Sequence, residues 1–215
     1  MLWLTILSLD NMFGIKMKKL LDDTKEYFYS VMSKSDDVFS LIKHVPEVER
    51  WVKKINEFYP NANLEIILFG VWLHDVAHYS VSDGEDHAVK SVEMATQFLA
   101  GKIDSPQLDQ ICHCIRSHRC KNVLPETLEA KILACADSAS HMTGIVYMDM
   151  LTTHQVEDVL AKLERDYRDV SVLPEVKRLL YPIYHLWINM LTEYQKLNLS
   201  KGNWHNHLKI FNSME

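Results

Sequence analysis

The sequence predicts an all-α fold, and two observations support this. Apolar residues recur at three-and-four spacing along most of the chain, whereas the alternation typical of strands is hard to find. The 215 residues include only six glycines and six prolines. A hydrophobic content of 47% and a charged content of 24% are ordinary for a compact domain and exclude general disorder. We therefore expect a helical core.

Eight helices are expected, and some have recognisable ends. Asp86 is a typical N-cap, and Gly101 is typical of the position after a C-terminus. Pro182 lies within the last helical pattern and should kink or divide it. The expected helices cover residues 18–32, 45–58, 64–77, 87–100, 106–117, 125–141, 155–167 and 175–197.

The length predicts one folding unit. We divide it into an N-terminal extension with the first helix (1–35), a core domain (36–142) and a C-terminal helical extension packed on the core (143–215). Met17 begins a run, MKKLLDDTKEYF, that is typical of a natural start, so residues 1–16 are expected to be an upstream extension. The apolar opening lacks a basic segment and is too short for a bilayer, so no membrane anchor is expected.

The net charge and the cysteines limit the classes of function that are expected. The net charge is −6 and no basic run is longer than two residues, so binding of nucleic acid is not expected. Three of the four cysteines crowd one short segment, where bridging one another would be awkward. Reduced thiols and a cytoplasmic location are expected for Cys112, Cys114, Cys120 and Cys135.

The segment LEIILFGVWLHDVAHYS ends an apolar run on polar residues. The apolar stripe of the helix expected at 64–77 continues onto His74 and Asp75, so both should face inward. A buried carboxylate without compensation is costly. The neighbouring imidazole could compensate Asp75, but a cation would do so better.

Three other helices direct polar residues inward. His44 lies at the start of the helix expected at 45–58, close to its apolar face, and Asp137 directly follows the apolar run AKILACA. Two imidazoles and two carboxylates form a ligand set of mixed donors, suited to Mn²⁺, Fe²⁺, Zn²⁺, Ni²⁺ or Co²⁺. The stripe of the helix expected at 106–117 points at His118, whereas His113 lies on the opposite side.

The order of His44, then His74-Asp75, then Asp137 resembles the H…HD…D signature of the HD superfamily of metal-dependent phosphohydrolases. HDVAHYSVSDGEDHAVKSVEMATQFL and CIRSHRCKNVLPETLEAKILACADSASHM also look like regions of single-domain bacterial HD hydrolases, and the resemblance covers residues 36–142. It implies an HD-domain helical bundle with additional C-terminal helices. It also implies a divalent metal (Mn, Fe, Ni, Co, Zn or Mg) on those four residues, and hydrolysis of a nucleotide or another small phosphate ester or anhydride by a metal-activated water.

The resemblance also suggests catalytic residues. His87 and His118 match further histidines that bind a second metal or the phosphate in some members. His78 would share a face with His74 on a continuing helix and serve as a general acid or phosphate contact. Arg119 and Lys121, beside His118, are candidates for substrate binding.

The departures from related enzymes bear on the substrate. The binuclear cyclic-dinucleotide phosphodiesterases have a histidine pair where this chain has Ser117-His118, and Lys where it has His78. One metal is therefore expected, a second is left open, and cyclic dinucleotides are not favoured. The acidic residues of the deoxynucleotidases and alarmone hydrolases are replaced by VAHY, and small nucleoside-triphosphate pyrophosphatases look nearest.

Two alternatives remain open at this stage, a non-catalytic HD module that binds a metal or nucleotide and a di-iron HD oxygenase. The simpler interpretation of each histidine is a cap or a hydrogen-bonded core residue. A zinc site at Cys112, Cys114 and Cys120 is disfavoured by its spacing, and a homo-oligomer is left open. We assign no function to the remaining histidines His141, His154, His185, His205 and His207.

Overall fold

The computed structural model describes residues 2–37, 40–82 and 84–197, with side chains from residue 14 onward. Over these ranges the chain forms helices joined by loops and no strand, so the predicted all-α class is confirmed. The elements are α1 (Leu2–Met32), α2 (Leu41–Asn56), α3 (Leu64–Leu73), α4 (His87–Leu99), α5 (Ser105–Ser117), α6 (Leu128–Thr143), α7 (Val146–Thr153), α8 (Val156–Asp169), the 3-10 helix η1 (Val170–Val172) and α9 (Pro174–Lys196).

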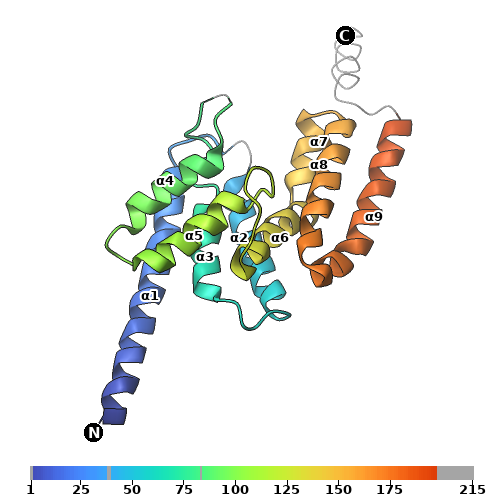
Figure 1. Ribbon diagram of the computed structural model, residues 1–215. Coiled ribbons are helices and arrows are strands. Elements are labelled where there is room, and N and C mark those ends of the chain that lie inside the picture. Colours follow the sequence, from blue (N-terminus) through green and yellow to red (C-terminus); the bar gives the residue numbers. More distant parts are fainter. Residues whose placement is uncertain (1, 38–39, 83, 198–215) are drawn as a thin grey trace.

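Two helices organise the core. α3 packs against α1, α2, α4, α5 and α6, and every residue from Ile66 to Leu73 is buried. α6 packs against α2, α3, α5, α8 and α9 and is buried almost all round, as the apolar run before Asp137 predicts. Figure 1 shows α4 and α5 on one side of this pair and α7, α8 and α9 on the other.

Local caps explain where several helices begin. The Asn63 side chain accepts the amide of Ile66 at the start of α3, and the Thr127 hydroxyl accepts that of Ala130 at the start of α6. Asp86 accepts the amide of Ala88, so its predicted role as the N-cap of α4 is confirmed. Each bond satisfies an amide that has no partner within its own helix.

Two predicted helix limits were wrong near the polar residues. α2 begins at Leu41 rather than at residue 45, so His44 lies inside its first turn. The cause is Asp37, whose carboxylate accepts the amides of Leu41 and Ile42 at 2.7 and 3.1 Å. α3 ends at Leu73 rather than at residue 77, and tighter turns follow through His78.

Further differences lie at the two ends of the chain. α1 extends back to Leu2, beyond the limit predicted at residue 18. α7 was not predicted; it is short, and the buried Tyr147 fastens it by donating to Asp166 at 2.7 Å. α9 continues through Pro182 because later residues hold it, among them Trp187, which donates to the Met142 carbonyl at 2.8 Å. The limits of α4, α5, α6, α8 and α9 agree with the prediction to within three residues.

Two further expectations concern the cysteines and the membrane. All four cysteines are free, as expected for reduced thiols. Among the described helices, none combines the length and the apolar character that a bilayer crossing requires.

The close approach of α3 to its neighbours predicts a sensitive position. A Cβ at Gly70 would lie 3.0 Å from Leu133 Cδ2 and 3.2 Å from Cys114 Cβ. Gly70→Val should therefore lower the free energy of unfolding by about 1–3 kcal/mol, measured by denaturant titration. Gly14→Val is the matched control because nothing lies within 4 Å of that position. Equal stabilities of the two variants would contradict the tight packing.

Candidate metal centre

Three helix segments bring four polar side chains into the core. His44 comes from the first turn of α2, and Asp137 comes from α6. His74 and Asp75 follow directly after the last residue of α3. All four are buried; His74 is 0% exposed and Asp75 and Asp137 are each 7% exposed. The inward orientation predicted from the helical stripes therefore places them in one cluster.

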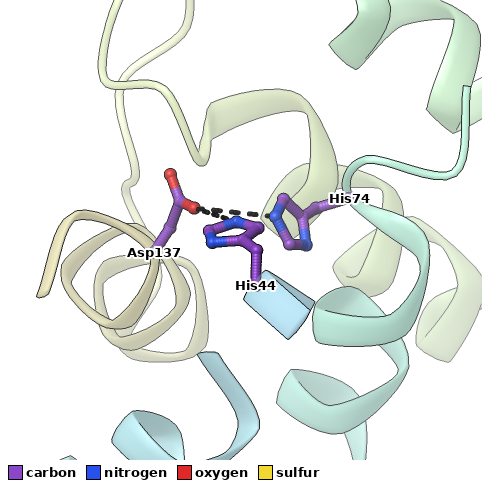
Figure 2. A group of neighbouring side chains, drawn as sticks. All are labelled: His44, His74 and Asp137. Atoms are coloured by element: carbon purple, nitrogen blue, oxygen red, sulfur yellow. Dashed lines mark ion pairs between the residues drawn. The ribbon is translucent and has the colours of Figure 1, made fainter. Parts of the chain in front are cut away.

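Asp137 joins the two histidines. Its Oδ1 lies 3.1 Å from His44 Nε2 and 3.6 Å from His74 Nε2. Figure 2 shows the carboxylate on α6 directed at both rings. Ligand atoms of these three residues lie within 4.8 Å of one another, which is close enough for all of them to contact one ion.

Asp75 extends the cluster towards α4 and α5. Its Oδ2 lies 3.4 Å from His74 Nε2 and 3.9 Å from His44 Nε2. Its Oδ1 lies 3.1 Å from His87 Nε2 and 3.6 Å from His118 Nε2. His74, Asp75 and His118 form a second group of ligand atoms within 4.8 Å. The sequence-predicted His87 and His118 therefore lie beside the four predicted ligands.

The rings of His74 and His118 are held by their own backbone. His74 Nδ1 lies 2.7 Å from the Val71 carbonyl, and His118 Nδ1 lies 2.7 Å from the Ile115 carbonyl. A carbonyl oxygen only accepts, so each Nδ1 carries the proton. When the rings are neutral, their Nε2 lone pairs face the carboxylates.

His44 is oriented by Ser140, one turn beyond Asp137 on α6. The Ser140 hydroxyl donates to the Asp137 carbonyl at 2.7 Å, so its lone pair can accept from His44 Nδ1, which lies 3.1 Å away. His44 Nε2 is then also left to act as an acceptor towards the cluster. Such outer contacts commonly fix the ligands of metal sites.

These groups fit a cation. Lone pairs of three rings and two carboxylates facing one another repel unless positive charge lies among them. Among the described residues, the buried His74 Nε2 and Asp75 Oδ1 make no hydrogen bond. A divalent metal would satisfy both atoms and neutralise Asp75 and Asp137, and mixed imidazole and carboxylate donors suit the ions expected from the sequence.

The same cluster shifts the pKa values of its members. Burial raises the pKa of Asp75 and of Asp137, but the neighbouring histidines outweigh it and hold both values well below their usual range. Burial lowers the pKa of His74, yet the two carboxylates raise it well above its usual value. Burial and the charge of His74 lower the pKa of His118 to about 4.

His141 is a residue that the sequence reasoning missed. It lies four residues after Asp137 on α6, and its Nε2 is 3.6 Å from Asp137 Oδ1. Its ring stacks on that of His44, with the centroids 5.0 Å apart. The spacing of four on a buried helix was a usable signal, because residues i and i+4 share a face.

α8 supports His141 from outside the predicted core. The buried Asp166 lies 3.1 Å from His141 Nδ1 and accepts from Lys162 at 2.8 Å. Burial raises the pKa of Asp166, but His141 and Lys162 outweigh it and lower the pKa below its usual value. Asp166 therefore stays ionised and links α8 to the centre.

Two cavities meet at the centre, and both are lined by Asp75, His78, His141 and Lys162. The first has a volume of about 660 Å³. The predicted residues His87, His118, Arg119 and Lys121 also line it, together with Asp137, Ser138, Arg165, Asp166, Arg168 and Asp169. The second, of about 690 Å³, contains apolar side chains from Leu41, Val146 and Met150.

His78 reaches the centre by a route different from the predicted one. The helix that was to carry it ends at Leu73, so a shared face with His74 was the wrong reason. Its ring instead lies 4.7 Å from that of His87, centroid to centroid, and burial lowers its pKa. Arg119 is held by Asp86, which accepts from it at 2.9 Å.

The lowered pKa of His118 predicts a pH effect on stability of the protein in chelator. The folded pKa of about 4 lies below the usual 6.5, so the unfolded chain binds more protons in this window. The free energy of unfolding should fall as the pH is lowered from 6.5 towards 4, by about 1.4 kcal/mol for each unit of pKa shift at the limit. His74 has a raised pKa, so its contribution to the free energy of unfolding is lost only above pH 6.5.

Denaturant titrations at several pH values test this. His118→Gln should reduce the dependence of the free energy of unfolding on pH between pH 6.5 and 4. His113 lies outside the cluster, so His113→Gln should not change that dependence. An unchanged slope in His118→Gln would contradict the assignment.

Ser140 predicts a separate effect on metal affinity. Ser140→Ala removes the contact that orients His44, so divalent-metal binding should weaken by about tenfold or more, measured by calorimetry with Mn²⁺. Ser138→Ala is the control because it is buried on the same helix and has no bond to His44. If both variants bind Mn²⁺ like the wild type, Ser140 does not position the ring.

Comparison with protein-family models agrees with this geometry. Residues 41–142 match the family model of the HD domain, and this segment contains His44, His74, Asp75 and Asp137. No curated protein matches the chain. It is similar to the crystal structure of a predicted HD superfamily hydrolase from an uncultured Thermotogales bacterium, with 23% identity and a TM-score of 0.49, over 77% of this chain and 91% of that one. Residues 41–142 of the chain therefore form an HD domain, the family that the sequence resemblance indicated.

Proposed function

We propose that the protein is a phosphohydrolase that acts on a nucleotide or another small phosphate ester or anhydride. The observation that carries this proposal is the position of the ligand cluster at the junction of two cavities, one of which is lined by basic side chains. A phosphate can then reach the cluster from the basic side while the rest of the molecule occupies the other cavity.

Four residues have the proposed role of metal ligands, namely His44, His74, Asp75 and Asp137. When bound, a divalent ion supplies Lewis acidity at a phosphoryl oxygen and lowers the pKa of a bound water. Asp75 and Asp137 would provide the negative charge that holds it. His74 belongs to both groups of neighbouring ligand atoms, one with His44 and Asp137 and the other with Asp75 and His118, which supports one shared ion per chain.

The three proposed catalytic histidines stand on the substrate side. His87 and His118 face Asp75, and their Nε2 atoms are 3.4 Å apart. With its pKa lowered to about 4, His118 is neutral at pH 7, and its Nε2 can accept a hydrogen bond from water. His78 lines both cavities, which supports its proposed contact to the phosphate.

Arg119 and Lys121 supply positive charge for the substrate. Both line the basic cavity, and Asp86 holds Arg119 in position through its carboxylate. A guanidinium and an ammonium group at this wall favour a phosphate over a neutral ligand.

The second cavity suits the organic part of the substrate. Its volume of about 690 Å³ lies within the range of small-molecule sites, about 300–1,000 Å³. Leu41, Val146 and Met150 offer apolar contact, and Thr152 and His154 offer hydrogen bonds. This mixture suits a nucleoside better than an all-polar metabolite. The free thiols also favour the proposed cytoplasmic location.

Asp75→Ala tests the function. Because it removes a carboxylate that contacts three histidines within 3.6 Å, we expect loss of bound metal and of phosphate release from a panel of nucleoside mono-, di- and triphosphates. The measurements are elemental analysis of protein purified without chelator, and a phosphate assay. Asp109→Ala, at an exposed site on α5, is the control. Unchanged turnover in Asp75→Ala would refute the assignment.

A further inference from the structure

α8 lies outside residues 41–142 yet forms one wall of the basic cavity. Its residues Lys162, Arg165 and Arg168 all line that cavity, facing a space that Arg119 and Lys121 also border. Besides Asp75 and Asp137, two carboxylates of the described part of the chain line it, Asp166 and Asp169. Basic side chains therefore concentrate here although the whole chain has a net charge of −6.

Pairing within the protein accounts for some of these charges. Lys162 donates to Asp166, and Arg168 donates to Asp169 at 3.1 Å. Arg119 donates to Asp86 at 2.9 Å. Arg165 and Lys121 are both exposed residues that line the cavity. They remain available to an anionic ligand.

The basic wall is longer than one phosphate requires. Lys162 contacts His141 at 2.9 Å and so marks the end nearest the ligand cluster. Arg168 lies six residues further along, about 9 Å on the helix axis. Charge-assisted hydrogen bonds to phosphate are only about 2.7–2.9 Å long, so one phosphate at the cluster does not use the far part of the wall.

We propose that Arg165 and Lys121 form a second anion subsite, which binds a further phosphate of the substrate beside the one at the ligand cluster. The proposal rests on the phosphohydrolase function above and narrows its substrate class to small molecules with at least two phosphate groups. Lys162 is the link between the two positions because it contacts both His141 and Asp166. The organic part extends into the apolar cavity.

Binding measured without turnover tests the subsite. Calorimetry on the full chain as purified compares inorganic phosphate with methylenediphosphonate, a diphosphate analogue that is not hydrolysed. We expect the diphosphonate to bind at least about tenfold more tightly, the effect of one added charge-assisted contact. In Arg165→Gln combined with Lys121→Gln, the ratio of the two dissociation constants should fall towards one.

Arg178→Gln combined with Lys196→Gln is the matched control. It removes the same charge from α9, where both residues pair with a glutamate at i,i−3 and do not line the cavity. The ratio of the dissociation constants of the two anions should be the same in this control as in the wild type. A wild-type ratio near one, absence of binding by either anion, or an equal loss in both double variants would overturn the subsite. Selective diphosphonate binding without phosphate release from any nucleotide would instead refute the hydrolytic function and leave the subsite standing.

Discussion

The structure depends on how two buried carboxylates are compensated. Asp75 and Asp137 lie in the core among imidazoles whose outer nitrogens are already protonated towards carbonyls or a hydroxyl. Ionised groups at such depth are costly without positive charge beside them. The apolar stripes of α3 and α6 lead directly to these two residues, so the packing that buries hydrophobic surface also assembles the negative centre. A bound cation would compensate both carboxylates.

Residues that follow from helical periodicity could be predicted. The stripe on α3 predicted that His74 and Asp75 face inward, and the apolar run of α6 did the same for Asp137, because the period of 3.6 residues fixes direction once a helix is recognised. The resemblance then joined them with His44. The limits of α2 and α3 were less accessible because the apolar pattern does not encode bonds between side chains and the backbone, such as those of Asp37 to the amide of Leu41 and of the His74 ring to the Val71 carbonyl.

The contribution of α8 could not be read from the chain in the same way. Lys162 and Asp166 have the three-and-four spacing of any solvated helix face, and only tertiary packing turns that face towards His141. α7 lacked a signal of its own, since it depends on the buried Tyr147 and its bond to Asp166. His141 could have been predicted from its position four residues after Asp137. The part of the site that α8 contributes thus depends on how the C-terminal helices pack on the core. Local helix propensity does not determine that packing.

The short contacts between ring nitrogens and carbonyls three residues earlier have a thermodynamic consequence. His74 and His118 are each clamped by the last turn of their own helix, so their side-chain rotamers are frozen when the chain folds. Freezing a rotamer-rich side chain at the moment of association would subtract about 0.5–1.5 kcal/mol from the affinity. Here the entropy of the two side chains is lost during folding, so ion binding would not have to include that cost.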